Sequence, residues 1–190
     1  MTDKLERRQR ILDMAVQLFG QNDPYTVQME DIAKAAGVAK GTLYNHFGSK
    51  EQLYLEALRS RLENLADILQ QAYKGRKEPW RDLRSFLIHW QSFMLRHPHF
   101  FSLYRRANGK EAKGELLALH QRVRGILHDV LKNGIDSGLF RDCTIDDTTD
   151  LIMGMLDHRV AALLQSDSHD NDPESILNLL RFGLKKRKRR

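Results

Sequence analysis

The chain has little of several features that would place it in common protein classes. It holds one cysteine, Cys143, so it forms no intrachain disulfide and no cysteine-based zinc site, and we expect a reducing, cytoplasmic setting. Its longest apolar run, around residues 151–156, is too short to span a membrane, and the first twenty residues lack the apolar stretch of a signal peptide. What remains is a globular chain of 190 residues.

Sequence motifs of catalysis and metal binding are also missing. We find no phosphate-cradling glycine loop, no H-E-x-x-H motif and no nucleophile elbow, which argues against an enzyme. His97 and His99 flank Pro98 at the spacing most similar to a metal site, yet the two rings do not share a helix face and no third ligand is evident. We therefore expect no catalytic residues, no metal and no cofactor.

The body of the chain has no net charge. Of the 31 Lys and Arg residues, six form the tail 185–190, which leaves 25 to balance the 25 Asp and Glu residues. The formal charge of +6 thus belongs to the tail alone. The tail either strengthens DNA binding non-specifically or is simply solvated, and any specific nucleic-acid site must depend on where single charges lie.

Apolar residues recur at spacings of three and four along almost the whole chain, and no stretch alternates convincingly. This pattern predicts an all-α protein. The expected helices cover residues 3–20, 27–36, 39–47, 50–73, 79–96, a short segment around 100–104, 115–137, 145–165 and 173–184.

The stretch GVAKGTLYNHFGSKEQL, residues 37–53, contains a short helix with an unusual outer face. Ala39, Leu43 and Phe47 are four residues apart and are expected to form its buried side. Ordinary solvated helices are covered by Glu, Lys, Gln and Arg, whereas this one presents a chemically mixed set that includes a helix-weakening glycine. The outward residues are Lys40, Gly41, Thr42, Tyr44 and Asn45.

A tight turn joins this helix to the one before it. Gly37 is expected to stop the second helix in a left-handed conformation, and Ser49 is expected to cap the fourth helix. Three short helices with such a turn describe a helix-turn-helix, whose last helix lies in the DNA major groove. The sequence therefore predicts that residues 39–47 read DNA.

The outward residue types suit that role. Lys40 can reach a phosphate or the acceptor edge of a guanine, and Thr42 and His46 can donate to phosphates or base edges. Gly41 lets the helix backbone approach DNA closely, and the hydroxyl of Tyr44 suits a phosphate oxygen. In the next helix, Lys50 is a cation in the first turn, where the helix dipole disfavours it, so we expect its partner to be an outside anion.

Residues 31–53, DIAKAAGVAKGTLYNHFGSKEQL, resemble the N-terminal signature of the tetracycline-repressor (TetR) family of bacterial regulators. The resemblance implies an all-helical homodimer with an N-terminal DNA-binding domain and a larger C-terminal domain that dimerises and binds a small effector. By position, the DNA contacts of the family fall on Lys40, Gly41, Thr42, Tyr44, His46 and Lys50.

The second helix departs from the family pattern at its start. The family often begins this helix with Thr-Thr or Thr-Ser, which caps the helix and touches phosphate. Val27 and Gln28 stand there in this chain. We expect Thr26 to take over the cap and the amide of Gln28 to reach a phosphate.

With this resemblance we divide the chain into a DNA-binding domain at 1–48, an effector-binding and dimerisation domain at 49–184, and the basic tail at 185–190. Aromatic and sulfur-containing residues recur on three helices of the larger domain. They are either ordinary core or the lining of an effector pocket, and His158 is either a core residue, a dimer contact or a polar group of that pocket. The candidate pocket residues are Trp90, Phe93, Met94, Phe101, Tyr104, Met153 and His158.

We predict a cytoplasmic, ligand-responsive transcriptional regulator. In this hypothesis it is a dimeric repressor that a small apolar or aromatic effector releases from a near-palindromic double-stranded operator, with no membrane involved. The alternative is a regulator of the same fold that a protein partner controls, and an enzyme is the more distant one.

Overall fold

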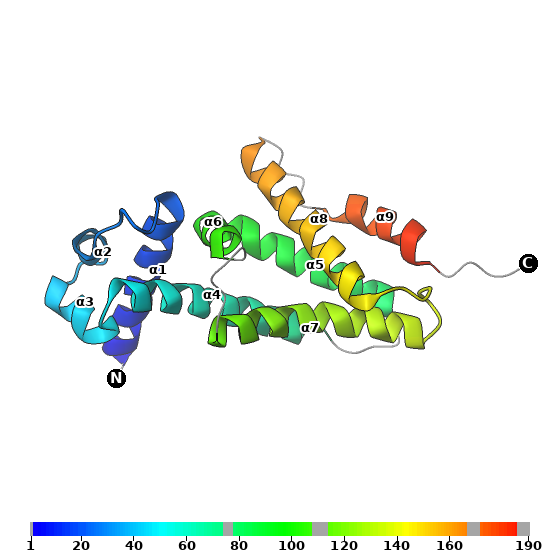
Figure 1. The fold of residues 1–190 in the computed structure, drawn as a ribbon, viewed down its shortest axis with the longest axis horizontal. Helices are drawn as coiled ribbons and strands as arrows, with labels where there is room; N and C mark the ends of the chain where they lie inside the picture. The colour runs from blue at the N-terminus through cyan, green and yellow to red at the C-terminus, as the bar shows by residue number, and fades with distance from the viewer. Residues whose placement is uncertain (1, 74–77, 108–113, 167–171, 186–190) are drawn as a thin grey trace, which may run out of the picture. The chain divides into compact units, whose positions relative to one another are not determined.

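The computed structural model describes residues 2–73, 78–107, 114–166 and 172–185, and their regular structure is helical (Figure 1). Among these residues the one pairing of extended backbone is an isolated antiparallel bridge between Phe140 and Lys185. The all-α prediction is confirmed. The helices are α1 (Thr2–Gln21), α2 (Met29–Ala35), α3 (Lys40–Phe47), α4 (Lys50–Ala72), α5 (Pro79–Arg96), α6 (Pro98–Ala107), α7 (Glu115–Asp136), α8 (Ile145–Gln165) and α9 (Glu174–Leu184).

The described chain forms two compact units. The first comprises Met1–Asn64 and His97–Leu119, and the second comprises Leu65–Arg96 and His120–Arg190. Helices α4 and α7 therefore contribute residues to both units. The first unit extends well beyond the predicted domain 1–48, and the functional division of the chain stays a prediction.

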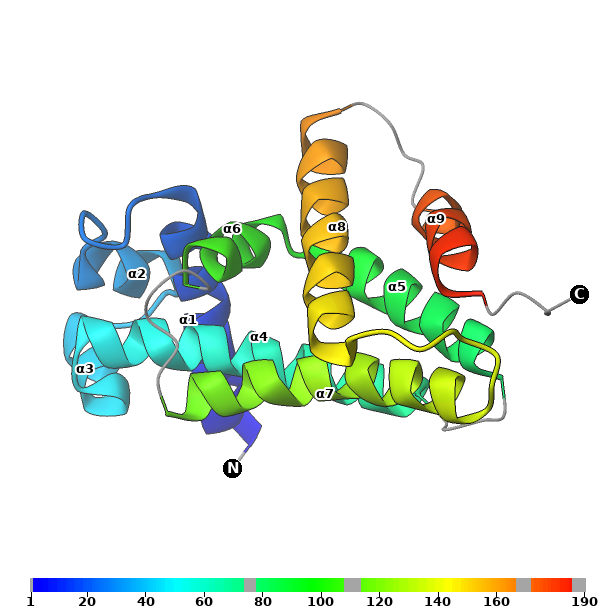
Figure 2. The same ribbon diagram turned by 45° about the vertical axis from the view of Figure 1, so that its right-hand side comes forward.

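In the first unit, α6 packs across the C-terminal end of α1 (Figures 1 and 2). The two helices are in close contact at Gly20, near the end of α1, since a Cβ at this position would overlap the carbonyl oxygen of His99. The guanidinium of Arg106 on α6 donates to the carbonyl oxygens of Phe19 at 2.5 Å, Gly20 at 3.1 Å and Asn22 at 2.8 Å. These bonds satisfy carbonyls that the end of a helix leaves without partners.

Gly20→Ala is expected to lower the free energy of unfolding by about 1–3 kcal/mol, because a backbone carbonyl cannot move aside as a side chain can. Gly41→Ala is the matched control, since a Cβ there meets nothing within 4 Å. That substitution should raise stability by up to about 1 kcal/mol through helix propensity alone. Urea unfolding of both variants measures the difference, and equal stabilities would show that α1 and α6 are not in close contact.

In the second unit, α8 packs across α5 (Figure 2). The ring of Phe140, which is 1% exposed, occupies the space that the missing side chain of Gly134 leaves on α7. It meets the ring of Trp80 edge-on, with 4.5 Å between the centroids. None of the described helices combines the length and the apolar character that a membrane crossing needs.

Candidate nucleic-acid interface

The turn between α2 and α3 is built as the sequence predicts. Gly37 has a φ of +65°, in the region that favours glycine, so it stops α2 and turns the chain. The amide of Val38 donates to the carbonyl of Ala33 at 3.0 Å, and that of Gly37 donates to Lys34 at 3.1 Å. Because these bonds tie the turn to the end of α2, the direction in which α3 leaves is set by the backbone.

One side of α3 is buried in the first unit. Leu43 is fully buried and Phe47 is 3% exposed, as predicted, and the guanidinium of Arg8 lies 5.5 Å from the centroid of the Phe47 ring. The prediction that Ala39 shares this buried side is wrong. Ala39 precedes the helix with extended dihedrals (φ −71°, ψ 145°) and is exposed, so the four-residue period does not apply to it.

The opposite side of α3 carries the predicted contact residues. Lys40, Gly41 and Tyr44 are exposed, whereas Thr42 and His46 are half-buried. Nothing in the described part of the chain requires a glycine at position 41, because φ is helical and a Cβ there would meet no atom within 4 Å. A close neighbour outside the chain, such as a DNA backbone, would account for the glycine.

Lys40 is bound to α2 across the turn. Its ammonium forms an ion pair with the carboxylate of Glu30 and lies 5.8 Å from the centroid of the Tyr44 ring. The hydrogen bond with Lys40 lowers the pKa of Glu30 from its ordinary value, and the same bond raises the pKa of Lys40. Sequence reasoning missed Glu30, since the nine residues between the partners include a turn, and the helical period that relates residues within one helix does not extend across it.

Lys50, in the first turn of α4, has partners inside the chain. Its ammonium donates to the carbonyl oxygens of Tyr25 at 3.0 Å and Val27 at 3.2 Å, so it fastens the loop before α2 to α4. These bonds give Lys50 partners that the sequence did not predict, and its contact with a DNA phosphate stays a prediction. The prediction for Ser49 is confirmed, because its hydroxyl oxygen accepts a hydrogen bond from the amide of Gln52 at 3.1 Å.

Helix α2 begins without a side-chain cap. The prediction for Thr26 is wrong, because its hydroxyl donates to the carbonyl of Asp23 at 2.8 Å instead. Gln28 occupies the cap position in an extended conformation and makes no capping bond. Its amide donates to the carbonyl of Thr26 at 3.4 Å, and its side chain is exposed. Gln28 therefore stays a candidate for a phosphate contact.

The seven candidate pocket residues are divided between the two units. Phe101 and Tyr104 belong to the first unit, and the other five belong to the second. Six of the seven are at most 8% exposed and fill the cores of their units. His158 is exposed, so the alternative that it is a core residue is wrong. Their part in binding an effector stays a prediction.

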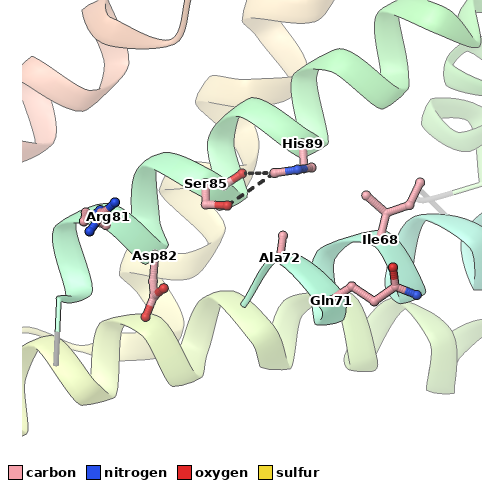
Figure 3. A pocket seen from close by; sticks show the side chains of 7 residues that line it. All are labelled: Ile68, Gln71, Ala72, Arg81, Asp82, Ser85 and His89. Carbon is pink, nitrogen blue, oxygen red and sulfur yellow. Dashed lines mark hydrogen bonds between the residues drawn. The ribbon is translucent and has the colours of Figure 1, made fainter. Parts of the chain in front are cut away.

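A cavity of about 500 Å³ lies elsewhere in the second unit, between the end of α4 and α5 (Figure 3). Arg81, Ser85 and His89 follow one another at intervals of four along α5, and Ile68 and Ala72 point toward them from α4. Gln71 and the nearly buried Asp82 complete the lining. Nδ1 of His89 donates to the carbonyl of Ser85 at 2.7 Å, since a carbonyl oxygen can only accept.

Metal ligands do not gather within the described ranges. There, no three side chains of His, Cys, Asp or Glu lie close enough together to hold an ion. His99 instead lies against Gly20, and its Nε2 is 3.4 Å from the amide nitrogen of Gln21.

Comparisons with known proteins agree with this geometry. Residues 11–57, which cover the buried stripe of α1 through the first turns of α4, match the family model "Bacterial regulatory proteins, tetR family". The chain is 30% identical over 156 residues to the HTH-type transcriptional regulator BetI of Rhizobium meliloti, covering 78% of this chain and 71% of that protein.

Two further comparisons extend these findings. The HTH-type transcriptional regulator AcrR of Shigella flexneri is 39% identical over 85 residues, which is 44% of this chain but only 40% of AcrR. The transcriptional regulator FadR of Bacillus subtilis, solved in complex with stearoyl-CoA, superposes with a TM-score of 0.78 at 23% identity, covering 90% of this chain and 96% of that one. At that identity the superposition establishes the fold.

Proposed function

Because the chain belongs to the tetR family of bacterial regulatory proteins, we propose that it acts as a repressor whose α3 reads a near-palindromic operator and which a small molecule releases. Its general class is a DNA-binding transcriptional regulator. The observation that carries the proposal is α3 itself. A glycine turn orients this helix, one side of it is buried, and the other side presents hydrogen-bonding residues around an open Gly41.

The proposed contacts divide by chemistry. Lys40 and Thr42 lie in the first turn of α3, where base edges are usually reached in the major groove. Tyr44, Gln28 and Lys50 are assigned to phosphates, which position the protein without carrying sequence information. His46, which is half-buried, contributes at the border of the interface.

Lys40→Ala is expected to weaken binding to the preferred duplex by about 1–3 kcal/mol and binding to mismatched duplexes by much less. The preferred duplex is first selected by the wild-type chain from a randomised library, and affinities are then measured by fluorescence anisotropy at fixed salt. Tyr44→Phe is the control, since loss of a phosphate contact should weaken all duplexes by similar factors. If selection enriches no sequence, or Lys40→Ala binds every duplex as the wild type does, α3 does not read bases.

A dimer explains why the operator should be near-palindromic, since the two copies of α3 would meet half-sites about 34–36 Å apart or a multiple of it. Exposed apolar side chains on the last two helices support this assembly. Leu151 on α8 is 68% exposed, and Leu179 and Phe182 on α9 are 65% and 88% exposed. Other large apolar residues of these two helices are buried within the chain itself and so are not available to a partner. They are Leu156, Val160, Ile176 and Leu180.

The effector is proposed to be a small organic molecule that binds the second unit. The volume of the cavity between α4 and α5 lies within the range of ligand pockets, and the related FadR was solved with stearoyl-CoA. The polar stripe of Arg81, Ser85 and His89 favours an effector with polar groups over the purely apolar one that the aromatic residues suggest. Such a ligand can shift the protein toward a non-binding conformer only by as much as it prefers that conformer.

Two further points complete the proposal. We place the protein in the cytoplasm, where its DNA is, and assign it no catalytic activity, in keeping with the relatives named above, all of which are transcriptional regulators. Control by a protein partner remains the alternative to a small effector. A metabolite that binds the second unit and lowers affinity for the selected duplex would decide in favour of the effector.

A further inference from the structure

The recognition helix α3 carries a single strong cation. Its sequence, KGTLYNHF, contains one lysine and no arginine, and that lysine, Lys40, is paired with Glu30 on α2. Both side chains are about half exposed, at 53% and 54%. Because the pair is exposed, it adds little to folding stability, and stability alone gives no reason for a carboxylate at this position.

A carboxylate beside α3 opposes DNA binding in two ways. It neutralises the Lys40 ammonium in the free protein, and it repels phosphates directly. No second lysine or arginine within α3 makes up for this loss. Glu30 therefore controls a large share of the positive charge that α3 can present to DNA.

We infer that Glu30 is a specificity-determining residue: it holds the Lys40 ammonium against α2, and so weakens binding to arbitrary DNA more than binding to the operator. The inference rests on the proposed function of α3. Binding to arbitrary DNA is almost entirely electrostatic, so the neutralisation of one cation removes the whole contribution of that cation to the affinity. Binding to the operator gains part of its free energy from contacts with base edges. A hydrogen bond from Lys40 to a base acceptor offsets the free energy that is lost when Lys40 separates from Glu30.

The test compares Glu30→Gln with the wild type on two duplexes, one selected from a randomised library and one with the same composition in scrambled order. At about 0.1 M salt, the variant should bind the scrambled duplex about three- to tenfold more tightly, and its salt dependence should steepen by about one released ion. Affinity for the selected duplex should change by less than about twofold, so that the ratio of the two affinities falls. An unchanged or larger ratio would overturn the inference.

Two controls distinguish an effect of the Glu30–Lys40 ion pair from a general effect of removing one negative charge. Asp31→Asn removes the same charge from the neighbouring exposed residue of α2, and it should have a smaller effect than Glu30→Gln. In a Lys40→Ala background, Glu30→Gln should lose most of its effect. An equal effect of Asp31→Asn, or an undiminished effect without Lys40, contradicts the inference. A selective loss of affinity for the selected duplex would instead show that Glu30 contacts bases itself.

A measurement on the free protein distinguishes two outcomes: this inference is wrong, or the proposed function is wrong. Carboxyl-carbon NMR titration should give Glu30 a pKa below its ordinary value because of the Lys40 ammonium, and Lys40→Ala should return the pKa to that value. An ordinary pKa in the wild type would show that the pair is absent, even if DNA is bound. A lowered pKa in a protein that binds no duplex would refute the proposed function of α3, and with it the specificity role inferred for Glu30.

Discussion

Leu43→Ala is expected to lower the free energy of unfolding by about 2–5 kcal/mol. Leu43 is fully buried, and it fastens α3 to the rest of the first unit together with Phe47. The truncated side chain loses its transfer free energy and leaves a cavity that a helix of eight residues, held by turns at both ends, cannot close fully. Urea unfolding at a fixed protein concentration measures the loss, since dimerisation would make the midpoint depend on concentration.

The control for this variant is Tyr44→Phe, the neighbouring residue on the exposed side of the same helix. Tyr44 is 42% exposed, so removal of its hydroxyl should change stability by less than about 0.5 kcal/mol. A Leu43→Ala protein as stable as Tyr44→Phe would mean that α3 is not packed against the first unit.

Phe182→Glu is expected to convert the proposed dimer to a monomer at micromolar concentration. Phe182 on α9 is 88% exposed, so its ring packs against little of the described chain. Exposed aromatic residues of this kind often anchor interfaces between proteins. Loss of such an anchor costs about 2–4 kcal/mol per copy, and a two-fold axis makes each dimer lose it twice. Sedimentation velocity gives the oligomeric state directly.

Leu55→Glu serves as the matched substitution for this experiment. Leu55 is 44% exposed on the part of α4 that belongs to the first unit, so the same charge introduced there should leave the dimer intact. A wild-type chain that sediments as a monomer would refute the dimer. Equal dissociation by the two variants would place the interface away from α9.

The helices themselves could be predicted from the sequence because their ends are local events. Spacings of three and four mark a buried face, and Gly37 and Pro98 end or begin helices through their own backbone preferences. The errors lie where helical geometry stops. Ala39 has the spacing of a buried residue but stands outside the helix, and Thr26 has the chemistry of a cap but bonds to Asp23 instead.

The interface was only partly predictable, because its partners come from separate elements. The outward residues of α3 follow from its period, whereas the pairing of Lys40 with Glu30 and the bonds of Lys50 to loop carbonyls depend on how α2, α3 and α4 meet. The candidate pocket shows the same limit. The spacing of apolar residues predicts which side chains are buried, and the burial of Trp90 and Phe93 is confirmed. The spacing does not show whether buried side chains fill a core or line a cavity.

The bonds of Arg106 to the end of α1 bear on the order in which the protein can mature on the ribosome. Helix α1 has no basic residue in its last turn, so the cation that complements its carbonyl end comes from a residue more than eighty positions later. Nascent α2 and α3 emerge long before α6, yet the helix on which they rest acquires its final contacts only after Arg106 has left the exit tunnel. The first unit thus completes its contacts only after more than half of the chain has been translated, and an N-terminal fragment that ends before α6 lacks the Arg106 bonds at the end of α1.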